Sequence, residues 1–93
     1  MEYKVIERFI PIYFGIVNGE GLLRDRLIDN WLDLTFLEPY DFPESSRYKF
    51  IHIKSLLSSN LDYISTIKSM DNEELQNVAD EISYLYFSVI KNK

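Results

Sequence analysis

Apolar residues recur at steps of three and four along most of the chain, and the pattern is clearest over residues 72–91. The repeat there consists of Leu75, Val78, Ala79, Ile82, Leu85, Tyr86 and Val89. This spacing gathers side chains onto one stripe of an α-helix. Asp71 and Glu74 have the spacing of a capping box, and Lys91 and Lys93 fall near the negative end of the helix dipole. The sequence therefore predicts a helix over residues 72–91, with an apolar stripe that another surface has to cover.

The same spacing runs through residues 2–18, which we predict to be helical in spite of an internal proline. The apolar positions of this segment are Val5, Ile6, Phe9, Ile10, Tyr13, Ile16 and Val17. Pro11 falls almost opposite the stripe, on the side expected to face solvent, and Gly15 lies on the same side. A proline there costs the hydrogen bond to the Glu7 carbonyl and kinks the helix outward.

A strand is the alternative for residues 10–17, because β-branched and aromatic side chains are frequent in that stretch. Asn18-Gly19 would then close a β-hairpin. The residues that follow have helical spacing, however, so this pair is better explained as the C-cap of a helix.

Residues 20–37 form the second predicted helix. It ends at Glu38-Pro39, because the residue before a proline avoids the α region. Its core face is expected to comprise Leu23, Leu27, Trp31 and Leu34, widened by Ile28 and Leu32.

A third helix is predicted over residues 43–57, beginning at Pro43, with Glu44 in the first turn, where the helix dipole favours a carboxylate. Its apolar residues spread around much of the circumference: Tyr48, Phe50, Ile51, Ile53, Leu56 and Leu57. A helix that is apolar on most sides is usually central, so we expect this one to lie in the middle of the fold. Residues 61–70 fit either a short helix or an irregular segment laid across the bundle.

Amphipathic segments joined by short connections favour helices packed against their neighbours. We therefore predict an all-α protein, an irregular four-helix bundle with helices at about 2–18, 20–37, 43–57 and 72–91. No repeat or low-complexity run divides the sequence, which predicts one helical domain over residues 1–93.

Composition narrows the classes of function. Hydrophobic residues make up 46% of the chain and aromatic residues 15%, which is rich for a small monomer and favours a dimer or a partner-bound state. The net charge of −5 argues against nucleic acid and against anionic membranes, and it permits a basic protein as partner. Cysteine is absent, so no disulfide or thiolate site is expected, as suits a reducing cytosol.

The apolar N-terminal stretch has some features of a signal peptide, but charged residues interrupt it and no small-residue cleavage site follows. Its longest uncharged run, Phe9 to Gly19, is too short to span a bilayer. We expect a mature cytoplasmic protein.

An acidic row is the first candidate site. Asp25, Asp29 and Asp33 recur every four residues, and so lie along one side of the second helix. The negative charge continues through Glu38, Asp41 and Glu44. The row would suit a surface rich in lysine and arginine, and the alternative is the solvated face of an amphipathic helix. A metal site is not expected, because carboxylate bundles that hold metals also supply histidine in a Glu-x-x-His arrangement.

The single histidine belongs to a second motif, because Arg47 and His52 stand five residues apart in Arg47-Tyr48-Lys49-Phe50-Ile51-His52. This six-residue stretch resembles the R-x4-H spacing of the all-helical HEPN-type ribonucleases. The resemblance implies His52 as acid and base at the ribose hydroxyl and Arg47 on the phosphate. Five residues correspond to about 500° of helix, so the two side chains point about 140° apart and converge only in a bent or dimeric site.

Aromatic residues outside the apolar stripes form the third candidate. Tyr84 and Phe87 lie well away from the stripe of the last helix, and Ile12 and Phe14 flank the stripe of the first. Exposed aromatic residues are typical anchors of protein interfaces. The alternative is that a neighbouring segment, such as residues 61–70, covers them.

The lead hypothesis is a non-enzymatic, acidic protein-binding module, of the immunity or inhibitor type with which bacteria neutralise a basic toxin or nuclease. The residues expected to bind the partner are Asp25, Asp29, Asp33, Tyr40, Asp41, Tyr84 and Phe87. The alternative is a homo-oligomeric structural or regulatory module, and the most distant alternative is the ribonuclease. No catalytic residue, cofactor or metal ion is expected, and neither nucleic acid nor a membrane is expected as a partner.

Overall fold

The computed structural model describes residues 2–58 and 62–91, with side chains from residue 7 onward, and this part of the chain is helical without strands. Its elements are α1 (Glu2–Val17), α2 (Leu23–Thr35), the 3-10 turns η1 (Pro39–Asp41) and η2 (Glu44–Ser46), α3 (Arg47–Leu56), α4 (Tyr63–Ser69) and α5 (Asn72–Lys91). The predicted all-α class is confirmed, and the strand alternative for residues 10–17 is wrong. The side chains of Val5 and Ile6, together with Leu61 and Lys93, lie outside the described residues.

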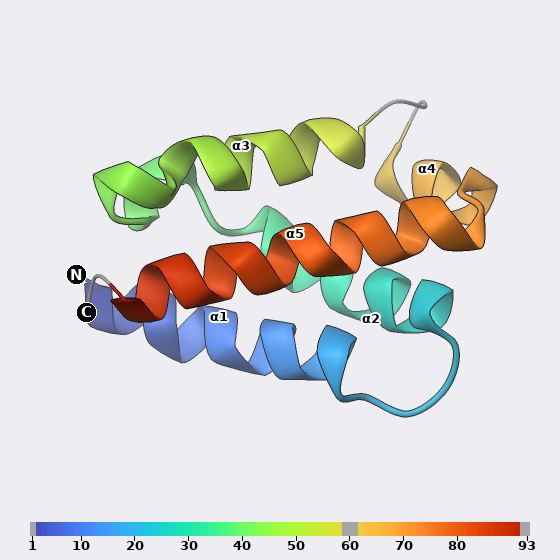
Figure 1. The fold of residues 1–93 in the computed structure, drawn as a ribbon, viewed down its shortest axis with the longest axis horizontal. Coiled ribbons are helices and arrows are strands. Elements are labelled where there is room, and N and C mark those ends of the chain that lie inside the picture. The colour runs from blue at the N-terminus through green and yellow to red at the C-terminus, as the bar shows by residue number, and fades with distance from the viewer. Residues whose placement is uncertain (1, 59–61, 92–93) are drawn as a thin grey trace.

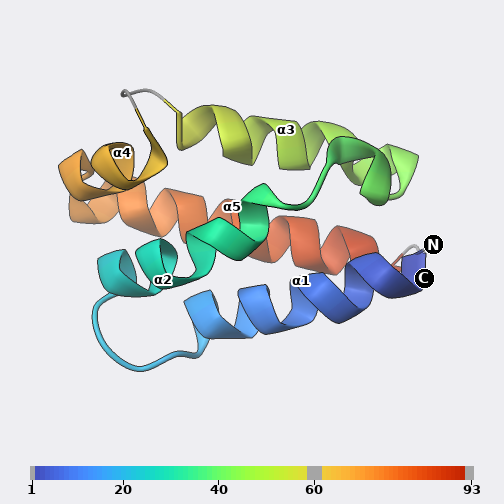
Figure 2. The same cartoon turned by 180° about the vertical axis from the view of Figure 1, so that it is seen from behind.

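Helix α5 is the centre of the fold. It runs between α1 and α3 in Figure 1, and α2 crosses behind it, as Figure 2 shows from the other side. The prediction that the helix of residues 43–57 is central is wrong. Helix α3 lies at one edge, where it packs against α5 and the two 3-10 turns and leaves Tyr48 and Ile51 exposed. No other described element packs extensively on the outer side of α3. Its apolar residues on that side are therefore exposed, and the helix is not central.

The apolar stripe of α5 is buried as predicted. The capping box is also present, since the Asp71 N–H donates to Glu74 Oε1 at 3.1 Å and the Glu74 N–H donates to Asp71 Oδ1 at 2.8 Å. Together the cap and the stripe explain why this segment is the longest helix of the described chain, with 20 residues.

Two helices are shorter than predicted, for local reasons. Helix α2 begins at Leu23 rather than residue 20, because Gly21 has a φ of +92°, which a right-handed helix does not permit. Pro43 adopts an extended ψ of 146°, so a 3-10 turn comes first and α3 begins only at Arg47.

Gly15 lies where α1 meets α2. A Cβ built on Gly15 would lie 2.5 Å from the Asn30 Oδ1 atom, so a larger residue there would require the Asn30 side chain to move. The prediction that Gly15 faces solvent together with Pro11 is therefore wrong for Gly15, whereas Pro11 is exposed as predicted. Helix α1 ends just before Asn18-Gly19, but the left-handed glycine of this loop is Gly21 and not Gly19.

Residues 61–70 contain the short helix α4, so the alternative of a short helix is correct and that of an irregular segment is not. Asp62 caps it by accepting a hydrogen bond from the Ser65 N–H at 2.7 Å, and this bond lowers the pKa of Asp62 below its usual range. Arg24 of α2 donates to the carbonyls of Ile67 and Met70 at the other end of α4. The guanidinium group of Arg24 thereby connects the C-terminal end of α4 to α2.

We expect Arg24→Met to lower the free energy of unfolding by about 1–2 kcal/mol, because it removes charge-assisted hydrogen bonds that are only partly buried. Urea denaturation measures the loss, and amide hydrogen exchange should be faster in Tyr63–Ser69 than in the wild type. Arg8→Met is the control, because Arg8 is exposed and has no hydrogen bond or ion pair among the described residues. Equal exchange in α4 for both variants would contradict this role of Arg24.

Candidate functional site

The outward side of α2 carries the predicted acidic row, with Asp25, Asp29 and Asp33 all exposed. Large apolar side chains are exposed on α2 and at its two ends: Leu32 is 64% exposed, and the cap residues Leu22 and Phe36 are 70% and 66% exposed. At about 100° per residue, Leu32 and Phe36 fall within about 20° of Asp25 on either side. We call this set the α2 surface; its members are Leu22, Asp25, Asp29, Leu32, Asp33 and Phe36.

The prediction that Leu32 widens the core face is wrong. The buried side of α2 is defined by Leu27, Trp31 and Leu34, and Leu32 points about 135° away from their centre. Ile28 lies nearer to that centre and is partly buried against the core, as predicted. The same angular spacing could have identified Leu32 and Phe36 in the sequence, because both fall within about 20° of Asp25.

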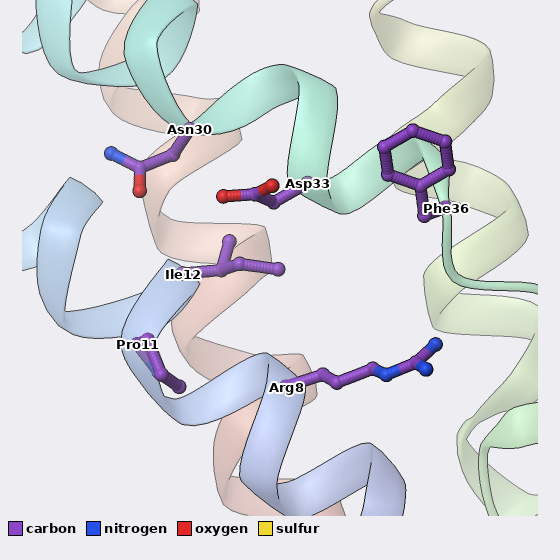
Figure 3. A pocket seen from close by; sticks show the side chains of 6 residues that line it. All are labelled: Arg8, Pro11, Ile12, Asn30, Asp33 and Phe36. Atoms are coloured by element: carbon purple, nitrogen blue, oxygen red, sulfur yellow. The ribbon is translucent and has the colours of Figure 1, made fainter.

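A groove of about 600 Å³ between α1 and α2 adjoins this surface. Figure 3 shows Arg8, Pro11 and Ile12 projecting into it from α1, opposite Asn30, Asp33 and Phe36 of the α2 segment. Within the described residues, Arg8 and Asp33 form no ion pair. The Asp33 side chain is exposed and lines the groove together with the exposed ring of Phe36.

The two other predicted residues near α2 differ in their roles. Tyr40 is exposed in η1, four residues after Phe36. Asp41 is half-buried, and its carboxylate accepts a hydrogen bond from the Glu38 N–H at 2.9 Å. Asp41 therefore caps the 3-10 turn, whereas Tyr40 extends freely from it.

Tyr84 and Phe87 are open to solvent, each 58% exposed on the outward side of α5. Helix α4 packs against α2 and does not cover them. They line a second groove of about 490 Å³, which we call the α5 groove; its lining consists of Ser45, Lys49, Tyr84, Phe87, Ser88 and Lys91. Phe87 also continues an aromatic cluster, because its ring centre lies 5.6 Å from that of Tyr86, and the Tyr86 ring stacks on Tyr13 at 3.9 Å. The two residues predicted to flank the apolar stripe of α1 differ in exposure, because Phe14 is exposed whereas Ile12 is buried.

The structure does not bring the R-x4-H pair together. Arg47 Nε donates a hydrogen bond to the Phe42 carbonyl at 3.0 Å, which ties the start of α3 to the preceding loop. The His52 Nε2 atom lies on the exposed side of α3, 3.8 Å from Glu81 Oε1 of α5. The contacts of both side chains are thus structural ones within the bundle.

In residues 7–58 and 62–91, no three His, Cys, Asp or Glu side chains are grouped so that they could hold a metal ion. The helices of this part of the chain also lack the combination of length and hydropathy needed to cross a membrane. Neither finding singles out a further site beside the two surfaces.

No protein-family model, curated protein or solved structure matches the chain. The functional inference therefore depends on the fold and its exposed side chains. These define an all-helical domain with an acidic and apolar α2 surface and a separate aromatic α5 groove that contains lysines.

Proposed function

We propose that this protein is a non-enzymatic binding module whose α2 surface docks onto a basic protein. The observation that carries this proposal is the combination of a row of three exposed aspartates on α2 with the exposed Leu32 on the same side of the helix and the exposed Leu22 and Phe36 at its two ends. In the narrower form, the module is of the bacterial immunity or inhibitor type, and it covers the active site of a basic toxin or nuclease. The absence of cysteine suits a cytoplasmic setting for it.

The carboxylates and the apolar side chains have different tasks in this mechanism. Asp25, Asp29 and Asp33 attract a basic partner and raise the rate of encounter, an effect that salt weakens. At contact, carboxylates accept paired hydrogen bonds from arginine. Leu32 and Phe36 supply apolar area that leaves water on binding, and such central anchors contribute most of the affinity of an interface.

A helix face that only meets solvent does not need these apolar side chains. Charged and polar residues normally occupy the outer face of an amphipathic helix. Phe36 lines the groove between α1 and α2, and Leu32 is exposed on the same side of α2 as Asp25. The combination of charge and apolar area therefore supports an interface more than a solvated face.

The test is a comparison of tagged wild type with Asp29→Lys plus Asp33→Lys in capture from an extract of the source cells. We expect wild type to retain a basic protein at low ionic strength and less of it at high ionic strength. The double variant should lose it at both, because like charges then face each other. Titration calorimetry with the purified captured protein gives the affinity of each form.

A matched control is Glu7→Lys plus Glu73→Lys, which changes the net charge by the same amount at exposed positions on α1 and α5. It should bind as wild type does. Leu32→Ser should weaken binding, whereas Ile51→Ser, at an exposed position on α3, should not. If both double variants bind equally well, or if no basic protein is retained, the proposal is wrong.

A further inference from the structure

The α5 groove is a basic site on an acidic protein. The chain has a net charge of −5, yet the two charged side chains that line this groove are both lysines, Lys49 and Lys91. Lys49 Nζ lies 4.9 Å from the centre of the Tyr48 ring, and Lys91 occupies the last turn of α5, where the helix dipole favours a cation. Tyr84 and Phe87 add two exposed aromatic rings to the same lining. The groove thus fits an occupant that carries both carboxylates and apolar side chains.

The α2 surface has this composition. Its aspartates are opposite in charge to the lysines of the groove, and its exposed Leu32 and Phe36 are apolar, as the aromatic rings of the groove are. Lysine and carboxylate form charge-assisted hydrogen bonds, and the aromatic rings gain from apolar contact. Each of the two surfaces therefore matches the other in charge and in apolar character.

One molecule cannot join these two surfaces by itself. Helix α5 is nearest to the viewer in Figure 1 and α2 is nearest in Figure 2, so their outward sides lie on opposite faces of the molecule. Two symmetric arrangements between copies are disfavoured by charge. A contact between the α5 grooves of two copies would bring lysines together. A contact between their two α2 surfaces would bring aspartates together, and like charges repel in both cases.

We propose that a second copy of this chain is the occupant of the α5 groove, in a head-to-tail contact between the groove of one copy and the α2 surface of the next. Such a heterologous contact extends into chains unless the rotation between copies closes a ring. It needs no other protein, and it is therefore independent of the basic partner proposed above. A basic partner on the α2 surface would compete with it.

Sedimentation equilibrium of the purified protein tests the association. We expect the mean mass to rise with concentration at low ionic strength, from the monomer mass of 11.1 kDa to more than twice that mass, because surfaces on opposite faces of the molecule do not close a dimer. It should return to 11.1 kDa as the Debye length falls from about 30 Å at 0.01 M salt to about 3 Å at 1 M. A mass of 11.1 kDa at every concentration and ionic strength would overturn the proposal.

Charge exchange identifies the contacting surfaces. Lys49→Glu plus Lys91→Glu should abolish association, and so should Asp29→Lys plus Asp33→Lys, because each places like charges across the contact. An equimolar mixture of the two variants should associate again, since each restores the attraction that the other lacks. Circular dichroism checks that both variants are folded. If the Asp29→Lys plus Asp33→Lys variant associates by itself as the wild type does, the head-to-tail contact is wrong. It is also wrong if the mixture of the two variants stays monomeric.

Discussion

Phe42→Ala is expected to lower the free energy of unfolding by about 3–5 kcal/mol, the cost of removing a buried aromatic ring and leaving a cavity. Phe42 is 0% exposed, although it lies in the connection between η1 and η2 and not in a helix. Its ring centre lies 5.7 Å from that of Phe9 in α1 and 4.5 Å from that of Phe50 in α3. The ring therefore joins α1 to α3 through a loop, so its loss should loosen both.

Phe36→Ala is the matched control, because it removes the same side chain from an exposed position just after α2 and should change the free energy of unfolding by about 0.5 kcal/mol or less. Urea denaturation followed by circular dichroism measures both. If Phe42→Ala does not fold, Phe42→Leu retains most of the apolar volume and should show a smaller loss. Equal transition midpoints for Phe42→Ala and Phe36→Ala would contradict the anchoring role of Phe42.

Ile82→Ala is expected to lower the free energy of unfolding by about 2–5 kcal/mol. Ile82 is fully buried on α5, the helix against which α1, α2 and α3 all pack. The higher helix propensity of alanine offsets only a few tenths of a kcal/mol, roughly. A loss of this size is a large part of the total stability of a domain, about 5–15 kcal/mol.

The control for this substitution is Ile51→Ala on the exposed side of α3. Its urea midpoint should lie close to that of the wild type, and the slope of the transition should be the same in all three proteins. A similar midpoint shift for Ile82→Ala and Ile51→Ala would show that α5 is not the centre of the core.

The helices could be predicted well from sequence where the apolar repeat is long and the ends are marked. The stripe over 72–91 and the capping box of Asp71 and Glu74 are both present as expected. Predictions at ends without such a cap were less accurate, as at residues 20 and 43. There the backbone of Gly21 and Pro43 decides the first residue of the helix.

The exposure of the residues in the candidate site was predicted in part. The aspartates of α2 and the aromatic pair Tyr84 and Phe87 are exposed, as an interface requires. The exposure of Leu32 was missed, because it was assigned to the wrong side of its helix. Lys49 and Lys91 could not be paired from sequence, since they lie on different helices and meet only across the α5 groove.

The sequence by itself determined the all-α class and the composition of each helix face. Both follow from the spacing of residues along one segment, which needs no knowledge of its neighbours. Only the tertiary structure decided that α5 is central, that Phe42 is buried and that the acidic and basic surfaces lie on opposite sides. These properties depend on which element covers which, because the burial of a side chain is set by packing partners that are distant in sequence.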